Sequence, residues 1–453
     1  MQTIAERLAA YASTLKYEDL PADVVHRTRR IIMDTLGCAI GGYDSEPARM
    51  ARELAGEVSS SRPATILCSG QKTSMDLAVF ANGVAIRYLD YNDGYISKGS
   101  GHPSDSIGGL LSPAEVMHSG GRDLILATVL AYEVFCRFCD VLEHKKTGFD
   151  HVMIGGIATA AGVARLFGLT REQTVEAINL TVAPGLALNQ TRVETVSNWK
   201  ACAYANANRN AVFAARLAQC GMTGPSPIFE GRDGFFRAVS HGPFELAEFG
   251  GKDRPYKLME CSTKRFALGQ YAQTVAHAAL EARALAGDIR EIAEVHVRAS
   301  TAALRSMAGD PEKWRPGSRE TADHSMPYTA AVALMYGTVG PQHFDERYFR
   351  DKDLLDLVAR VKCTPSEEAD RREAEMSLCE LELVLRSGER KPVRAEYHRG
   401  HWRNPMSDAE IEEKFRSLAA GVLPETRVDA LITRLWKLEE LRDVATLVEL
   451  VRT

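Results

Sequence analysis

The hydrophobic positions in the first 240 residues follow the spacing of helices. The stretch "TREQTVEAINLTVAP" opens with a capping box, Thr170 with Gln173, and its helical pattern stops at Pro184. The runs "IGGIATAAGVARLFGL" and "ACAYANANRNAVFAARLAQCGM" are rich in Ala and Gly, which is typical of helices that pack closely through small side chains. We therefore expect an all-helical domain in this part of the chain.

After residue 265 the pattern changes from helical spacing to alternation. In "EIAEVHVRAS", Val295 and Val297 alternate with polar residues, and "SLCELELVLRSGERKPVRAEYH" alternates in the same way before a turn at Ser387-Gly388. These two segments are predicted to be half-buried strands. Because helical patterns such as "QYAQTVAHAALEARALA" and "DHSMPYTAAVALMYG" fall between them, the region predicts a smaller α+β domain.

The last part of the chain returns to a helical pattern. The stretch "NPMSDAEIEEKFRSLAAG" has a second capping box at Ser407 and Glu410. We expect this tail to pack against the N-terminal helices, which would make the α+β unit an insertion. The predicted fold is mainly α: a large all-helical domain of residues 1–265 and 401–453, containing both termini, plus an inserted α+β lid domain of residues 266–400.

The composition is that of an ordinary soluble globular protein, with 45% apolar and 25% charged residues among 453. The net charge of −5 and the pI near 6.2 give no basic stripe, so nucleic acid is not expected as a partner. No apolar run reaches the ~18 residues that span a bilayer, and "MQTIAERLAAYASTL" is an amphipathic pattern rather than a targeting signal. We expect a cytoplasmic protein with no membrane partner.

The nine cysteines are scattered from Cys38 to Cys379 and are expected to be free thiols. Cys136 and Cys139 in "FCRFCD" form a CxxC pair, which is compatible with metal binding or redox chemistry. The pair lies inside the apolar pattern "LILATVLAYEVFCRFCDVL", where positions i and i+3 share a helix face. Two buried helix thiols are therefore the favoured interpretation, and no metal site is predicted.

The stretch "LDYNDGYISKGSGHPSD", residues 89–105, is polar and punctuated by glycines in a chain otherwise rich in Ala, Leu and Val. A loop histidine near carboxylates is suited to proton transfer at neutral pH, and glycines let the backbone approach a ligand. The alternative is a solvated loop with Asx-turns. The candidate residues are Asp90, Asp93, His102, Ser104 and Asp105.

Two further segments carry candidate chemistry on histidine and lysine side chains. In "KTGFDHVMIGG", Asp150 and His151 precede a Gly-rich helix start, where an anion is favoured; the alternative is a structural histidine. Lys200 in "VSNWKACAYANANRN" and Lys264 in "CSTKRFALGQYAQT" are placed to hold a carboxylate. The alternative for each is a surface lysine with a buried stem.

A fourth segment, "GDPEKWRPGSRETADHSMPYTAAVAL", gathers ionisable groups just before a helical pattern. His324 and Tyr328 are four positions apart, so they share a helix face if Pro327 lies in the first turn. The candidates in this segment are Arg319, Glu320, Asp323, His324 and Tyr328.

Together these segments resemble the MmgE/PrpD family, and in particular its 2-methylcitrate dehydratase-like members. The similarity rests on "LDYND…GHPSD", "YEVFCRFCD", "GFDHV", "WKACAYANANRN", "EGRDGFF" and "DPEKWRP.SRETADHSMPY". It extends from the first helix through "GHWRNPMSDAEIEEKFR", so it covers nearly the whole chain. The "RETADHSMPY" and "GHPSD" blocks are highly specific.

The resemblance implies a large all-helical domain, a smaller α+β domain and an active site between them. It also implies a homodimer that acts on a small carboxylate by dehydration, decarboxylation or epimerisation, with no cofactor, iron–sulfur cluster or nucleotide. The catalytic residues implied in this way are Asp90, His102, His151, Lys200, Lys264 and Tyr328. The candidate substrate-binding residues are Asp93, Ser104, Arg319 and His324.

The sequence departs from the family pattern at two places that bear on the substrate. Gly94 stands where Thr is common, which removes a hydroxyl and would enlarge the cleft. Where relatives often have a Lys-aromatic-Pro pattern followed by a histidine, this chain has Ala267 and Tyr271.

The resemblance and the candidate residues predict a cofactor-independent carbon–oxygen lyase. Its expected substrate is a β-hydroxy tricarboxylate of the 2-methylcitrate or citrate type, as in propionate metabolism. Dehydration requires abstraction of a proton next to a carboxylate and protonation of the departing hydroxide. His102, assisted by Asp90, is the first choice for proton transfer, while Lys200, Lys264 and Arg319 are expected to supply positive charge.

Alternative functions stay open at this point. One is a decarboxylase of cis-aconitate type, and another is an epimerase or isomerase of a related dicarboxylate such as iminodisuccinate. A non-catalytic module is disfavoured because the ionisable groups are so dense. An aconitase-like metalloenzyme is disfavoured because the sequence offers only one CxxC.

Overall fold

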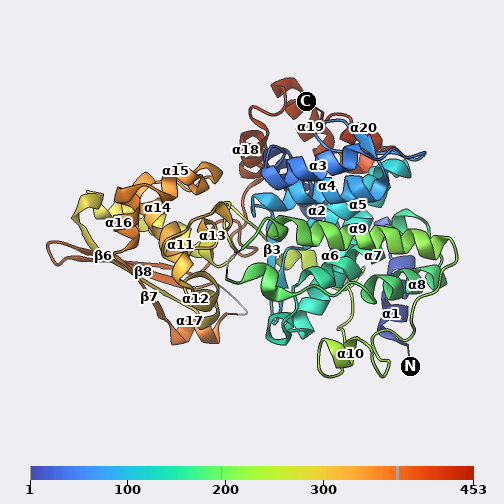
Figure 1. The fold of residues 1–453 in the computed structure, drawn as a ribbon, viewed down its shortest axis with the longest axis horizontal. Coiled ribbons are helices and arrows are strands. Elements are labelled where there is room, and N and C mark those ends of the chain that lie inside the picture. The colour runs from blue at the N-terminus through green and yellow to red at the C-terminus, as the bar shows by residue number, and fades with distance from the viewer. Residues whose placement is uncertain (1, 195, 374–376, 453) are drawn as a thin grey trace.

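The computed structural model describes residues 2–194, 196–373 and 377–452. Figure 1 shows two parts side by side: a larger part of stacked helices that holds both ends of the chain, and a smaller part in which helices lie against a sheet. The helices of the larger part are α1 (Ile4–Thr14), α2 (Ala22–Gly41), α3 (Glu46–Gly56), α4 (Met75–Tyr88), α5 (Ser106–Val116), α6 (Gly121–Val141), α7 (Val152–Leu166), α8 (Arg171–Val182), α9 (Trp199–Gln219), α10 (Phe235–Ala238), α18 (Asp408–Ala419), α19 (Glu425–Trp436) and α20 (Ala445–Val448).

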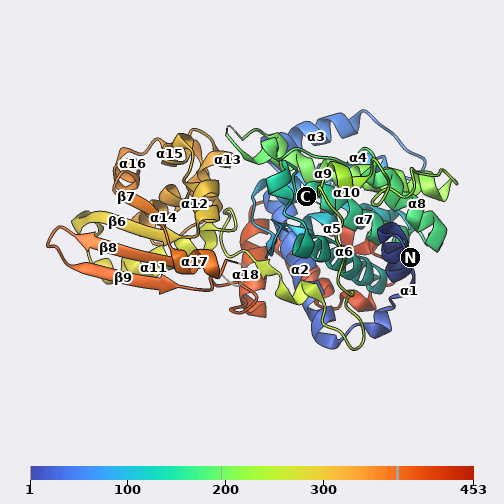
Figure 2. The ribbon, with the colours of Figure 1, turned by 90° about the horizontal axis from the view of Figure 1, so that it is seen from below.

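The smaller part combines helices with a four-stranded sheet in the order β7-β6-β8-β9. Strands β6 and β7 are parallel, and the other neighbours are antiparallel. Figure 2 shows α11 lying along this sheet, where it packs against β8 and β9. The elements are α11 (Ala272–Ala286), β6 (Ile292–Ala299), α12 (Thr301–Met307), α13 (Arg319–Ala322), α14 (Met326–Tyr336), α15 (Glu346–Phe349), α16 (Lys352–Val358), β7 (Val361–Pro365), α17 (Glu367–Arg371), β8 (Cys379–Leu385) and β9 (Arg390–Ala395).

The two parts have separate hydrophobic cores. The buried apolar side chains of the larger core come from residues 4–261 and 406–451, and those of the smaller core come from residues 266–395. A mainly helical fold with a smaller α+β part is therefore confirmed. We retain the boundaries at 265/266 and 400/401 as proposed domain limits.

The predicted long elements are confirmed where one face is buried. Thr170 caps α8 and Ser407 caps α18, each in the expected capping box. In β8, Cys379, Leu381 and Leu383 are buried while their neighbours are half-buried, which is the predicted alternation. The turn between β8 and β9 contains a glycine with positive φ, Gly388, at 86°.

The larger part is not all-helical, which corrects the prediction. It also contains β1 (Ala64–Thr65) paired with β2 (Lys72–Thr73), and a three-stranded sheet in the order β4-β3-β5. The strands of that sheet are β3 (Asp93–Ile96), β4 (Ser100–Gly101) and β5 (Ser262–Thr263). Strands of two to four residues are too short to show an alternating pattern.

The three-stranded sheet fixes the polar stretch of residues 89–105. Strand β3 pairs with β5, and Lys264 N donates to Asn92 O at 3.0 Å, so Lys264 is brought beside this stretch. Lys414 of α18 donates to the backbone carbonyls of Tyr91 and Lys264 at 2.6 and 2.8 Å. Its Nζ also lies 2.6 Å from Asp34 Oδ1 in α2. Helix α18 therefore fastens the stretch to the core.

The cysteine pair of the CxxC lies inside α6, and both thiols are buried, as predicted. Cys136 Sγ also lies 3.7 Å from Cys261 Sγ, a proximity that the sequence did not indicate. Within the described ranges, every helix is too short or too polar to cross a membrane.

Candidate active site

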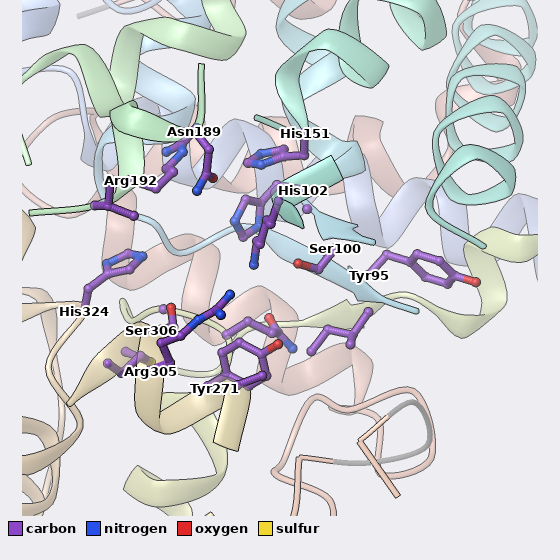
Figure 3. A pocket seen from close by; sticks show the side chains of 18 of the residues that line it. Tyr95, Ser100, His102, His151, Asn189, Arg192, Tyr271, Arg305, Ser306 and His324 are labelled. Carbon is purple, nitrogen blue, oxygen red and sulfur yellow. The ribbon is translucent and has the colours of Figure 1, made fainter. Parts of the chain in front are cut away.

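A cavity of about 470 Å³ opens between the two parts, and side chains from both line it. Among the side chains of the larger part that line it are His102, His151 and Arg192, which lie on one side of the cavity in Figure 3. Arg305 and Tyr271 of the smaller part lie across from them. The cavity therefore has the position that the family resemblance implied for an active site.

Asp90 lies beside this cavity with its side chain fully buried. The residue follows Leu89, the C-cap of α4, and has a left-handed backbone, with φ of 49°. Such a conformation costs roughly 1 kcal/mol or more in a non-glycine residue, so the surroundings must hold it. Arg87 Nη1, one turn earlier, and Lys264 Nζ both form ion pairs with Asp90 Oδ1.

Lys200, Asp323 and His324 complete the buried cluster around Asp90. Lys200 Nζ lies 2.9 Å from Asp323 Oδ1 and 3.4 Å from Asp90 Oδ2. His324 Nδ1 lies 2.6 Å from Asp323 Oδ1, and its Nε2 lies 3.2 Å from Asp90 Oδ2. Lys200 comes from the first turn of α9, whereas Asp323 and His324 lie between α13 and α14. Ion pairs therefore join the two parts next to the cavity.

Burial and neighbouring charges shift the acid–base equilibria of this cluster. Burial raises the pKa of Asp90, but Arg87 and Lys264 outweigh it and hold that pKa well below its ordinary value. Burial raises the pKa of the Asp105 carboxyl to about 7, although Arg87 opposes the rise. Burial also lowers the pKa of the Lys264 ammonium to about 8, against the attraction of Asp90.

The cluster carries a small excess of positive charge at neutral pH. It contains the basic side chains of Arg87, Lys200 and Lys264. Two carboxylates, Asp90 and Asp323, face them, and Asp105 is only partly ionised near pH 7. This balance favours a negatively charged ligand in the adjoining cavity.

His102 is held as a neutral imidazole with one free nitrogen. Its Nδ1 lies 2.6 Å from the backbone carbonyl oxygen of Asp93, which makes Nδ1 the donor. Its Nε2 lies 3.9 Å from Asp90 Oδ1. Burial, reinforced by Arg87 and Lys264, lowers the pKa of His102 well below its ordinary value. At neutral pH the ring is therefore unprotonated, and its free nitrogen has the lone pair that a general base requires.

His151 is a second neutral imidazole on the same wall, with its ring centroid 5.4 Å from that of His102. Its Nδ1 lies 2.7 Å from Asp150 Oδ1, and Asp150 Oδ2 accepts a bond from Arg192 Nε at 2.9 Å. Burial lowers the pKa of His151 to about 4, although Asp150 opposes the shift. Asp150, itself held by Arg192, therefore fixes the orientation of the His151 ring.

The structure does not bring Asp93 and Ser104 to the cavity. Asp93 Oδ1 accepts bonds from Ser104 Oγ at 2.5 Å and from Ser104 N at 3.1 Å. Asp93 Oδ2 accepts a bond from Tyr132 Oη of α6 at 2.6 Å. These contacts hold the polar stretch in place, so both residues support the site from within the larger part.

Tyr328 also lies apart from the cavity. Pro327 is in the first turn of α14 as expected, but His324 precedes the cap of that helix, so His324 and Tyr328 do not share a helix face. Tyr328 Oη instead donates to His343 O at 2.9 Å inside the core of the smaller part.

Arg319 lies at a different contact between the two parts. Its Nη1 donates to Pro341 O at 3.0 Å, and its guanidinium carbon lies 5.4 Å from the ring centroid of Tyr88 in α4. The structure therefore places this side chain against α4 rather than in the cavity.

Sequence reasoning did not single out several residues that line the cavity. Arg87 precedes Asp90 by three positions, so helical spacing offered a usable signal. Arg192 and Arg305 lie outside the quoted motifs, and Gln270 lies in "CSTKRFALGQYAQT" but was not singled out; the place of all three in the cavity follows from the packing of the two parts.

Asp90, Asp323 and His324 are also the kind of group that can hold a metal ion, since their ligand atoms lie within 4.8 Å of one another. However, Lys200 Nζ lies within 3.4 Å of both carboxylates and 3.0 Å from His324 Nδ1. An ammonium group already supplies the positive charge there, so this set does not fit a metal ion well.

Comparisons with known proteins agree with the motifs. Residues 6–247 match the MmgE/PrpD N-terminal domain, and residues 266–438 match the MmgE/PrpD C-terminal domain. The chain is 30% identical over 451 residues to the 2-methylcitrate dehydratase of Cupriavidus necator, covering 92% of this chain and 90% of that protein. It is 26% identical over 468 residues to the cis-aconitate decarboxylase of Homo sapiens, covering 100% of this chain and 95% of that protein.

A third relative is the 2-methylcitrate dehydratase of Escherichia coli K12. Identity is 28% over 428 residues, which cover 87% of this chain and 85% of that protein. The two matching domains together span most of the sequence. The chain belongs to the MmgE/PrpD family.

Proposed function

We propose that the protein is a cofactor-independent lyase that dehydrates a small β-hydroxy tricarboxylate of the citrate or 2-methylcitrate type. The observation that carries this proposal is the pair of neutral imidazoles, His102 and His151, which face the cavity beside the buried cluster around Asp90. Dehydratases of 2-methylcitrate among the relatives support the same reaction class.

Positive charge around the cavity supports a substrate with several carboxylates. In addition to the cluster, Arg305 of α12 lines the cavity and has no ion-pair partner among the described residues. Lys145 lines it from the larger part, with its Nζ 6.0 Å from the ring centroid of Tyr271. Arg305 and Lys145 can bind carboxylates of the substrate, so His102 and His151 are not needed for that purpose and can face the reacting carbon atoms.

The proposed reaction begins when His102 Nε2 takes a proton from the carbon next to a carboxylate. The negative charge that develops on that carboxylate is stabilised by the basic side chains of the cluster. Hydroxide then leaves with the electrons of its carbon–oxygen bond and takes up a proton, which gives water and an alkene. The His102 imidazolium formed in the first step can return this proton, with His151 beside it as a second proton carrier.

Decarboxylation of cis-aconitate is a second candidate. It is supported by the human relative that carries this name and is similar over the whole of this chain. Loss of CO2 leaves a carbanion, which needs a proton donor but no departing hydroxide. The same imidazoles and cations can serve that reaction.

We also propose that the smaller part acts as a lid, because it forms one side of the cavity, and that two copies form a homodimer. Exposed apolar side chains on the larger part support the dimer. Trp199 and Phe213 on α9 are 47% and 55% exposed, and Met50 and Leu54 on α3 are 53% and 54% exposed. Analytical ultracentrifugation of the purified protein tests this assembly.

Incubation of the purified protein with 2-methylcitrate, citrate, cis-aconitate and an iminodisuccinate source tests the reaction class. We expect alkene absorbance to appear with 2-methylcitrate or citrate. CO2 released from cis-aconitate without alkene formation from the hydroxy acids would establish the decarboxylase instead. A change of chirality with iminodisuccinate as the sole activity would establish an epimerase.

A further inference from the structure

Asn189 is an uncharged polar residue of the cavity wall whose side-chain amide is left free by the rest of the described chain. It begins the 3-10 turn Asn189–Arg192 and lines the cavity together with His102 and His151. Figure 3 shows its amide directed into the cavity on the side of these two imidazoles. Neither amide atom has a hydrogen-bond partner among the described residues, and neither is among the polar atoms that are shut off from solvent. Both atoms are therefore open to a ligand.

Backbone hydrogen bonds fix the segment that carries this amide. Asn189 N donates to Gly148 O at 2.9 Å. Just before the turn, Ala187 O accepts a bond from Asp150 N at 2.8 Å. Arg192, at the end of the same turn, donates from its Nε to Asp150 Oδ2 at 2.9 Å. The amide therefore projects into the cavity from a segment that is fastened on both sides.

Asn189, His102 and His151 form a wall of the cavity that offers uncharged hydrogen-bonding groups. Both imidazoles are neutral, because burial lowers the pKa of each. Arg192 lines the cavity beside them, but its Nε and Nη1 already donate within the larger part, and its Nη2 is shut off from solvent. A ligand at this wall therefore meets an amide and imidazoles rather than a free cation.

The charges in the cavity decide which group of the substrate this wall receives. At neutral pH a hydroxy tricarboxylate has ionised carboxylates, which only accept hydrogen bonds, and one hydroxyl, which both donates and accepts. The carboxylates are drawn to cations such as Arg305 and Lys145, which line the cavity and form no ion pair with any described residue. An amide also donates and accepts, so Asn189 matches the hydroxyl whichever way the amide is turned.

Gly94 contributes no side chain to the recognition of the hydroxyl. A Cβ atom at position 94 would stand 2.5 Å from Gln270 Oε1, which is too close for non-bonded atoms. The missing side chain therefore does not enlarge the cleft as expected, because Gln270 fills the space. An uncharged group elsewhere in the cavity has to hold the hydroxyl.

The proposed base lies on the same wall, which suits the reaction. Dehydration removes a proton and a hydroxyl from adjacent carbon atoms, so the group that holds the hydroxyl has to lie near the group that takes the proton. Asn189 lines the cavity on the side of His102. We propose that Asn189 binds the hydroxyl of the substrate and so selects acids with a hydroxyl over acids without one. This inference rests on the function proposed above and adds the residue that recognises the leaving group.

Isothermal titration with citrate and with tricarballylate, which has three carboxylates but no hydroxyl, tests this inference. All proteins carry His102→Asn so that bound citrate is not consumed. For Asn189→Ala we expect the Kd of citrate to rise roughly fivefold to tenfold, the size of one hydrogen bond, and that of tricarballylate to change less than ~twofold. The fold should be kept, because the amide of Asn189 has no partner among the described residues.

Gln190→Ala is the matched control, because Gln190 is the next residue of the same turn, is exposed and donates to Glu194 Oε2 at 3.0 Å. Both Kd values should stay unchanged in this variant. Ser100→Ala removes another uncharged polar side chain that lines the cavity, from β4, and the preference for citrate over tricarballylate should survive it.

Three outcomes would overturn the inference while leaving the proposed function in place. The parent protein could bind citrate and tricarballylate equally well, the preference for citrate could survive in Asn189→Ala, or it could be lost in Ser100→Ala instead. Failure of the parent protein to bind citrate and tricarballylate alike would overturn both the inference and the proposed function.

Discussion

Lys264 and Asp90 form an ion pair in which both side chains are fully shielded from solvent. Lys264 Nζ also donates to the backbone carbonyl of Asp90 at 2.9 Å, across 174 positions of sequence. The pair joins the polar stretch after α4 to the segment after β5. It therefore stabilises the fold and places positive charge beside the cavity at the same time.

Replacement of Lys264 by Met is expected to affect both roles. It leaves the buried Asp90 carboxylate with fewer cations, so we expect the free energy of unfolding to fall by about 3 kcal/mol, the low end for a broken buried pair. Arg87 and Lys200 still face Asp90, so the loss of unfolding free energy should not exceed this low value. Turnover should fall ~100-fold, the size of a lost charge-stabilising group. Urea unfolding and steady-state kinetics measure the two effects.

Lys252→Met is the matched control, since Lys252 is exposed, and it should leave both quantities unchanged. Wild-type stability and turnover in the Lys264→Met protein would contradict the assignment of this pair to the site.

Replacement of His102 by Asn is expected to separate catalysis from folding. The Asn amide can still donate to the carbonyl of Asp93, but it has no nitrogen that accepts a proton. We expect turnover to fall at least ~100-fold with the unfolding free energy changed by less than about 1 kcal/mol. The control is His118→Asn on the surface, where the side chain is 73% exposed. Near-normal turnover in the well-folded His102→Asn protein would show that a residue other than His102 is the general base.

The sequence predicted the long elements because each of them buries one face and carries its own end signals. Strand β8 alternates buried apolar residues with more polar ones. Thr170 and Ser407 are the N-caps of α8 and α18 and mark where these helices begin. The strands β3 to β5 were missed because they contain too few residues for a pattern. Their pairing is set by tertiary contacts, which a local pattern does not record.

The site was predictable only as far as its motifs reached. The polar stretch drew attention to Asp90 and His102, which the structure places beside the cavity, but it offered no way to separate His102 from Asp93. That distinction depends on Tyr132, which satisfies Asp93 from a helix far along the chain. Gln270 lies in the quoted stretch "CSTKRFALGQYAQT", but no local pattern there showed that its side chain packs against Gly94.

Asp105 should make the stability of the protein depend on pH in a direction opposite to that of most carboxylates. Burial raises the pKa of its carboxyl to about 7 in the folded state, while the unfolded value is about 3.9. Between these two pH values the Asp105 carboxyl is protonated in the folded state but ionised in the unfolded state. The free energy of unfolding is therefore highest, as far as Asp105 is concerned, below about pH 4, and this contribution is lost as the pH rises through about 7.

Asp105→Asn removes this titration, so the variant should gain stability relative to the wild type as the pH rises from 4 to 7. The relative gain should be on the order of 4 kcal/mol, from about three pKa units at 1.36 kcal/mol each. Urea unfolding at several pH values measures the difference. Asp253→Asn, at an exposed position, should show no such trend. A difference between Asp105→Asn and the wild type that stays constant with pH would mean that Asp105 is ionised throughout.

Activity is expected to survive exhaustive treatment with EDTA. The best candidate ligands among the described residues, Asp90, Asp323 and His324, already share the ammonium of Lys200, so a divalent cation would have to enter beside an existing positive charge. Like charges at such short range in a buried site repel strongly. The measurement is turnover before and after chelation, with the metal content of the protein determined in parallel by mass spectrometry. Loss of turnover that one particular metal restores would show that the cluster binds a cation, and the role of Lys200 would then have to be reassigned.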